Sequence, residues 1–139
     1  MTALEKMVQW LKTFPLWDDA KLHIDYLAAE PENAGLYPQG LEEVARREDV
    51  LGNVTVLCRL HFMLYRRTFG QQDSGENSTW LLQLQQWVQS QSAFGLAPVF
   101  GDAPEKERIR AEQGKLQKAR QTGTGLYAVA ITAEFEKHY

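Results

Sequence analysis

The longest pattern in the chain is an alternation of side chains between Asn53 and Phe69. In steps of two, one side carries apolar residues, namely Val54, Val56, Cys58, Leu60, Phe62 and Leu64. The other side is mixed, with Thr55, Leu57, Arg59, His61, Met63 and Tyr65. A period of two predicts a β-strand with one face in a core. A strand of about 15 residues spans roughly 50 Å, whereas most strands have about 5–6 residues. We therefore expect one end of this strand to extend past its own domain toward other subunits.

Two other segments alternate in the same way, and two are ambiguous. Leu22–Leu27 and Leu126–Tyr139 each predict a strand, the second with Tyr127, Val129, Ile131, Ala133 and Phe135 on one face. Leu41–Glu48 has good helix propensity, but its place just before the long strand favours the first strand of a hairpin, so we predict a strand. In the polar stretch 104–121 we predict an edge strand at Glu107–Gln113 and a mobile connector from there through Gly125.

Two segments have helical spacing. Thr2 and Glu5 have the spacing of a capping box, and the stripe after them ends before Pro15; it consists of Leu4, Met7, Val8, Leu11 and Phe14. The second helix starts at Asn77 or Ser78 and ends at Phe94-Gly95, with Trp80, Leu81, Leu84, Trp87, Val88 and Gln91 at helical spacing. We expect loops at Glu30–Gly40, Gly70–Asn77 and Leu96–Pro104.

The expected order is helix, three strands, helix, two strands. This order predicts an α+β fold, in which two helices pack on a largely antiparallel sheet with one unusually long strand. At 139 residues the chain is long enough for one core, so we expect a single domain over residues 1–139.

Composition narrows the class of protein. The chain is 44% apolar and 24% charged, with a net charge of −3 and a pI near 5.6, which argues against a protein that mainly coats nucleic acid. A single cysteine, Cys58, excludes an internal disulfide and a cysteine metal cage. The sequence has neither a membrane-length apolar stretch nor the h-region of a signal peptide, so we expect a cytoplasmic, reduced protein.

The sequence carries no recognisable catalytic signature. His23, His61 and His138 have no ligand partner at metal-binding spacing, and Cys58 falls on the apolar strand face, where an inert thiol is expected. A nucleophile elbow, a Walker loop and a Gly-x-Gly-x-x-Gly motif are all missing. We therefore predict a protein that is not an enzyme and has no catalytic, cofactor-binding or metal-binding residues.

The basic cluster between Lys106 and Arg120 is the best candidate for binding. It is either a solvated mixed-charge edge or a contact for phosphates or for an acidic partner surface, to which Arg59, Arg66 and Arg67 could add. The second use gives an alternative function, a small nucleic-acid-binding accessory protein that uses residues 106–120. Trp17, beside Pro15 and Asp18, is a candidate for an exposed partner contact.

Four stretches carry a resemblance to a known family. They are Trp10–Leu16 at the end of the first helix, Leu22–Pro31 with its Glu-Pro corner, the long strand leading through Tyr65-Arg66-Arg67 into the Trp80–Trp87 helix, and the aromatic end Gly125–Tyr139. In pattern and order they resemble tail terminator and head–tail connector proteins of tailed bacteriophages, sometimes filed as minor capsid proteins. The match covers most of the chain.

The resemblance implies a structural protein of the virion, made in the host cytoplasm and placed at the head–tail junction. Similar proteins form a ring, usually of six copies, which stops growth of the tail tube and docks the head connector. The implied partners are further copies, the tail tube protein and head connector proteins, with DNA only as passing cargo, no membrane and no cofactor. We expect the interface at the Tyr65–Phe69 end of the long strand and in the loops at 30–40 and 70–77. The candidate residues are Tyr37, Tyr65, Arg66, Arg67, Phe69, Lys106, Arg108 and Arg110.

Overall fold

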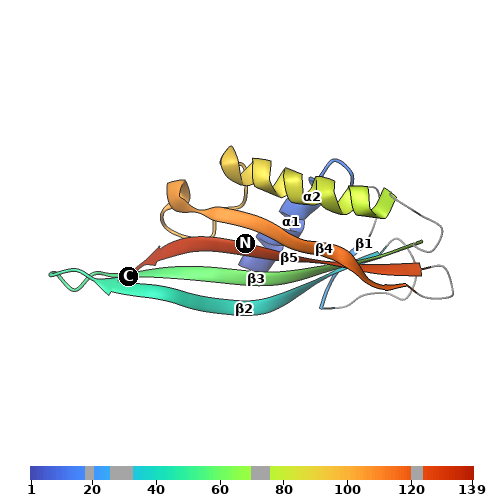
Figure 1. Cartoon of the computed structure of the whole chain (residues 1–139). Coiled ribbons are helices and arrows are strands. Elements are labelled where there is room, and N and C mark those ends of the chain that lie inside the picture. The colour runs from blue at the N-terminus through green and yellow to red at the C-terminus, as the bar shows by residue number, and fades with distance from the viewer. Residues whose placement is uncertain (18–20, 26–32, 70–75, 120–123) are drawn as a thin grey trace.

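A computed structural model describes residues 1–17, 21–25, 33–69, 76–119 and 124–139 (Figure 1). The elements are α1 (Ala3–Leu11), β1 (Lys21–Ile24), β2 (Asn33–Glu48), β3 (Val54–Phe69), α2 (Glu76–Ala93), the short 3₁₀ helix η1 (Pro104–Lys106), β4 (Arg108–Ala119) and β5 (Thr124–His138). Apart from η1, their order is the one expected from the sequence.

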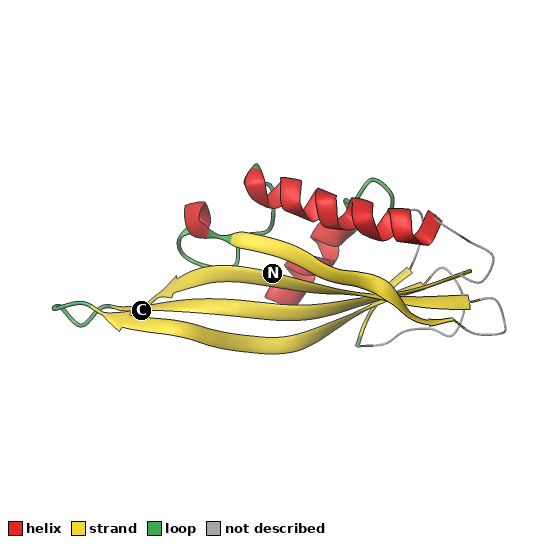
Figure 2. Ribbon diagram, viewed as in Figure 1, coloured by secondary structure: helices red, strands yellow, loops and turns green. Residues whose placement is uncertain are grey.

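The strands form one sheet in the order β1-β2-β3-β5-β4. Three of the pairings are antiparallel, and β1 alone runs parallel to its neighbour, β2. With two α-helices packed on this mixed, largely antiparallel sheet, the predicted α+β fold is confirmed (Figure 2).

The core lies between the helices and one face of the sheet. The apolar side of β3 faces it as predicted, with Phe62 and Leu64 almost fully buried. The capping box of Thr2 and Glu5 is present, and α1 and α2 meet through stacked rings of Trp10 and Trp87, 4.8 Å apart. The side chains of Met7, Leu11, Leu36, Leu84, Val88, Val129 and Ile131 are also fully buried in the core.

The first strand is shorter and the second longer than the sequence predicts. The strand expected at Leu22–Leu27 ends at Ile24, because Asp25 takes a left-handed backbone conformation (φ 56°). The loop expected at Glu30–Gly40 is wrong from Asn33 onward, where the chain is already in β2. A bulge between Pro38 and Gly40, with Gly40 at φ 117°, lets the strand continue past the proline. The strand predicted at 41–48 is confirmed.

The mobile connector predicted after Gln113 is also wrong in part. Strand β4 continues to Ala119 and pairs with β5 up to the partners Ala119 and Gly125, with two register shifts on the way. Backbone pairing supports an edge strand even where apolar residues are few, so the weak apolar pattern was misleading. Residues 120–123 of that connector and 70–75 of the polar loop lie outside the described residues, and α2 already begins at Glu76.

The long strand is confirmed, but it does not extend beyond its own sheet. It pairs with β2 from Val54 to Arg67 and with β5 from Thr55 to Phe69, and Val54 also exchanges two backbone hydrogen bonds with Tyr139. What extends past the helices is the Val54 end of the β2–β3 hairpin, opposite to the end expected (Figure 1).

Candidate assembly surface

The most distinctive surface is the largely exposed end of the β2–β3 hairpin, residues 40–55, here called the hairpin arm, whose turn reaches past the helices (Figure 1). Every residue from Gly40 to Asn53 is exposed. Among them are the apolar side chains of Leu41, Val44, Val50 and Leu51. Hence the hairpin arm presents apolar groups to solvent without helices to cover it.

The turn at the end of the hairpin arm is held in one conformation by Asp49. Its carboxylate accepts hydrogen bonds from the backbone N–H groups of Leu51 (2.8 Å) and Asn53 (3.0 Å) and from the Asn53 side chain (3.0 Å). These bonds, led by that of the Asn53 side chain, lower the pKa of Asp49. Gly52 supplies the positive φ (86°) that the turn needs.

This fixed turn displays two apolar side chains. Val50 is fully exposed and Leu51 is 84% exposed. Single apolar residues are frequent on protein surfaces, but two adjacent ones on a rigid projecting turn are candidates for a contact with another subunit. We call Val50 and Leu51 the hairpin tip.

A shallow groove lies at the base of the hairpin arm. It has a volume of about 360 Å³ and is lined by Leu41, Glu43, Arg46, Val54, Val56, Cys58 and Tyr139. Val56, Cys58 and Phe135 form a small second core beneath it. Burial raises the pKa of the Cys58 thiol, which fits the expected inert side chain.

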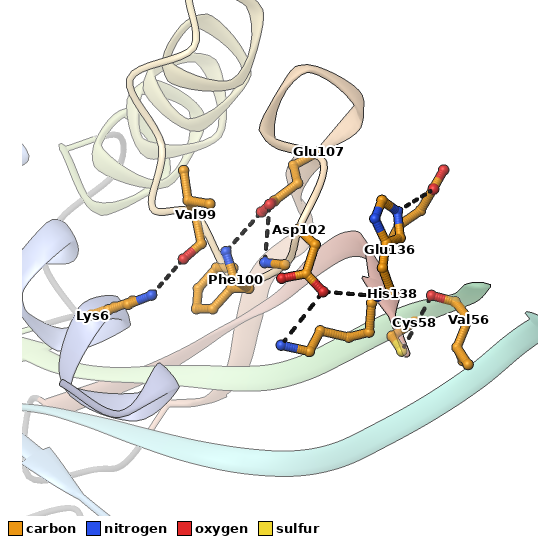
Figure 3. Close-up of polar contacts among 11 residues, drawn as sticks. Lys6, Val56, Cys58, Val99, Phe100, Asp102, Glu107, Glu136 and His138 are labelled. Carbon is orange, nitrogen blue, oxygen red and sulfur yellow. Dashed lines mark hydrogen bonds and ion pairs between the residues drawn. The ribbon is translucent and has the colours of Figure 1, made fainter. Parts of the chain in front are cut away.

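The loop that follows α2 is fastened over this second core, as Figure 3 shows. The Glu107 carboxylate accepts from the backbone N–H groups of Phe100 (2.8 Å) and Gly101 (3.0 Å), and Asp102 accepts from that of His138 (2.8 Å). The His138 bond lowers the pKa of Asp102. Gly101 passes so close to the Glu136 carbonyl that a Cβ there would collide with it. The loop is therefore a rigid surface beside the base of the hairpin arm.

The sheet face away from the helices carries paired charges. Cross-strand register places Glu42, Arg59, Glu134 and Arg108 in one row across four strands. Arg59 forms an ion pair with Glu134 at 3.0 Å, and His61 lies between Glu42 (3.0 Å) and the Thr132 hydroxyl (3.2 Å). Opposite charges thus alternate along the row, so this face does not present a continuous positively charged surface.

The basic candidates of the sequence also lie beside carboxylates. Lys106, in η1, forms an ion pair with Glu136 (3.6 Å), and Arg110 forms one with Glu112. Arg108 is exposed opposite Glu134. The structure brings these three residues together at the start of β4. The side chains of the remaining cations of the 106–120 segment lie outside the described residues.

At the far end of β3, the structure describes two of the four predicted interface side chains. Tyr65 is half-buried and meets Tyr37 edge-on at 5.4 Å. Arg66 is only 7% exposed, and its guanidinium lies 4.0 Å from the centre of the Trp80 ring. Arg66 therefore belongs to the core, which corrects its prediction as an interface residue. The backbones of Arg67 and Phe69 are in β3, but their side chains lie outside the described residues.

Trp17 was a candidate for an exposed contact, and the structure corrects this as well. It is 9% exposed and packs against Trp80 at 5.8 Å.

Among the described residues, no group of three or more His, Cys, Asp or Glu side chains is placed to hold a metal ion. Within the same residues, none of the helices combines the length and apolar character needed to cross a membrane.

Sequence reasoning missed the hairpin tip. Val50 and Leu51 precede the long strand and were not among the candidate residues. A signal was present, because two apolar residues between an aspartate and Gly52-Asn53 cannot enter a core if the segment is a tight turn.

Comparisons with known proteins do not identify a family for this chain. No protein-family model matches the chain. A search of curated proteins likewise found no significant match.

Proposed function

We propose that this chain is a structural subunit of the head–tail junction of a tailed bacteriophage, a tail terminator or head–tail connector that acts by assembling into a ring. The observation that carries the proposal is the hairpin arm with its rigid, exposed apolar tip. The resemblance in pattern and order of elements supports the same class. In this proposal the partners are other copies, the tail tube and the head connector.

A ring needs a head-to-tail contact between two different surfaces of the subunit. The hairpin tip is one such surface. A second exposed apolar area follows α2, formed by Phe94, Leu96 and Val99 on the rigid loop described above. We assign the ring contact to these two areas, with the hairpin tip of one copy docking on the loop of the next.

The alternative of a nucleic-acid-binding accessory protein has less support. Phosphate binding depends on cations that can replace counterions. Here Arg59, Lys106 and Arg110 each lie within ion-pair distance of a carboxylate. We therefore do not advance it.

The test replaces both residues of the hairpin tip, Val50→Ser with Leu51→Ser. Because both side chains are solvent-exposed, the free energy of unfolding should change by less than about 0.5 kcal/mol. Ring formation by the purified protein, seen by negative-stain electron microscopy, should be lost, as should capping of added tails.

The matched control is Leu16→Ser, which removes an exposed leucine beside Trp80, near the end of α2 that lies away from Phe94. It should leave rings and capped tails unchanged. Rings that persist in the tip variant would refute the assigned contact, and a wild-type protein that neither forms rings nor binds tails would refute the proposed function.

A further inference from the structure

The two edges of the sheet differ in how their backbone groups are satisfied. On β4, the outward N–H of Ile109 donates to the Ser92 hydroxyl (3.1 Å), and the outward carbonyl of Ala111 accepts from the Gln85 amide (3.2 Å). Side chains of α2 therefore cap this edge at two successive outward positions. Capping of this kind keeps an edge strand from pairing with another chain.

The other edge, β2, is covered only at its beginning. Strand β1 pairs with Asn33–Leu36, and within the described residues no strand pairs with the outer side of β2 beyond Leu36. Antiparallel partners alternate between hydrogen-bonded and non-hydrogen-bonded pairs. Val54 exchanges hydrogen bonds with Tyr139, on the β5 side of β3. Its neighbour Thr55 and every second residue after it therefore direct their backbone groups to the other side, toward β2. The groups that point outward from the hairpin arm are therefore those of Leu41, Glu43, Arg46 and Glu48.

The residues along this bare edge have a self-complementary order of charge. The segment 42–47 reads Glu-Glu-Val-Ala-Arg-Arg. If it pairs antiparallel with an identical segment, Glu42 faces Arg47 of the other copy and Glu43 faces Arg46, each twice. The small apolar pair Val44 and Ala45 lies at the centre. All four charged side chains are exposed, and each has a partner in the single chain: Glu42 contacts His61 (3.0 Å), Glu43 pairs with Arg46 (2.6 Å), and Arg47 pairs with Glu136 (3.7 Å).

We propose that a second copy of this chain binds along this edge, in an antiparallel two-fold contact centred between Val44 and Ala45. The two sheets then continue into one another, with the outward backbone groups of Glu43 bonded to those of Arg46 in the partner. In the same register Leu41 lies opposite Glu48. A two-fold contact closes after two copies. It is therefore separate from the head-to-tail contact of the proposed ring and does not depend on it.

The structure limits the length of this contact. Pro38 lacks an N–H group, and the bulge between Pro38 and Gly40 bends the strand, so pairing is confined to residues 41–48. A second bulge, between Glu43 and Ala45, lies at the centre of the contact, so the backbone bonds form on either side of Val44 and Ala45. Dimerisation exchanges the three contacts that the four charged side chains make in the single chain for intermolecular ones. Exposed ion pairs contribute little energy, so the charges select the register while backbone bonds and the extended sheet supply affinity. A contact of this size forms a reversible dimer.

The test uses two charge variants of the full chain and sedimentation velocity over a wide range of concentration. Arg46→Glu with Arg47→Glu, and Glu42→Arg with Glu43→Arg, each place like charges opposite one another in the two-fold register. We expect the wild type to dimerise as concentration rises, each variant alone to stay monomeric, and an equimolar mixture of the two variants to form a heterodimer. Circular dichroism checks that each variant is folded.

Amide hydrogen exchange tests the register of the proposed two-fold contact directly. Protection of the N–H groups of Leu41, Glu43, Arg46 and Glu48 should rise with wild-type concentration, whereas Glu42, Ala45 and Arg47, bonded within the hairpin, should not change. A wild type that stays monomeric at all concentrations overturns the proposal. So do variants that dimerise alone as well as the wild type, or a mixture of the two that stays monomeric.

Discussion

Arg66 shows how burial changes the role expected for a residue from its sequence neighbours. In the sequence it is part of an Arg-Arg step at one end of a strand, which favours an exposed cation. Its position in step with Phe62 and Leu64 places it instead on the helix-covered face, over the ring of Trp80. A cation over the face of a desolvated tryptophan is stabilised by the ring quadrupole. The same parity that predicts the core face of β3 thus carries this arginine into the core.

We predict that Arg66→Glu strongly destabilises the fold. The change puts a carboxylate against the electron-rich face of Trp80 in a buried position, and we expect the free energy of unfolding to fall by about 3 kcal/mol or more. Urea unfolding followed by tryptophan fluorescence measures it. The control Arg110→Glu makes the same chemical change at an exposed position and should cost about 1 kcal/mol or less. Equal effects of the two changes would show that Arg66 is not held in the core.

At the scale of elements, strands are defined here as much by their neighbours as by their own residues. Asn33–Gly40 carries a proline and two glycines, yet it is a strand because β3 pairs with it on one side and β1 pairs with its beginning on the other. The polar β4 is a strand because β5 supplies its ladder and α2 caps its outer edge. A segment with weak apolar alternation can therefore still be an ordered edge.

The cap of β4 leads to a prediction about solubility. Ser92→Ala removes the acceptor of the Ile109 N–H, which should lower the free energy of unfolding by about 1 kcal/mol and expose an edge donor that can pair with another chain. Turbidity during mild heating should rise faster than for wild type. Ser90→Ala is the matched control, because the Ser90 hydroxyl donates within α2, to the Trp87 carbonyl at 3.0 Å. If Ser90→Ala aggregates as fast as Ser92→Ala, the capping role is wrong.

The whole molecule divides into a body and an arm. In the body, both helices cover the sheet, and Phe62, Leu64, Val129 and Ile131 are at most 2% exposed. The hairpin arm has no helix over it, and its residues from 40 to 53 are exposed. Local opening costs little free energy where few apolar contacts are lost. The molecule thus combines a stable base with a projecting element suited to contacts between subunits.

This division predicts two levels of amide hydrogen exchange. In dilute protein, where copies do not associate, the paired amides of Ala45, Arg47 and Thr55 should exchange at least about a hundredfold faster than those of Phe62 and Leu64. Exchange measured by mass spectrometry or NMR on the full chain checks this. Uniform protection along β3 would mean that arm and body open together, and the description of two parts would fail.

Only part of the candidate surface could be predicted from the sequence. The basic residues Lys106, Arg108 and Arg110 do come together at the start of β4. The carboxylates beside Lys106 and Arg108 come from β5, whereas Glu112 beside Arg110 is a neighbour in the sequence. The hairpin tip was overlooked because a pattern search values apolar residues for burial, whereas Val50 and Leu51 are exposed.

By itself, the sequence determined the features that depend on neighbours along the chain: the capping box at Thr2 and Glu5, the order of helices and strands, and which side of β3 is apolar. Only the tertiary structure decided which end of the long hairpin leaves the body, that Arg66 is buried, and that one sheet edge is capped while the other is bare. The physical reason is that propensity, capping and side-chain parity act between residues a few positions apart. Strand pairing, helix cover and edge capping join residues far apart in sequence, and no local pattern specifies those partners.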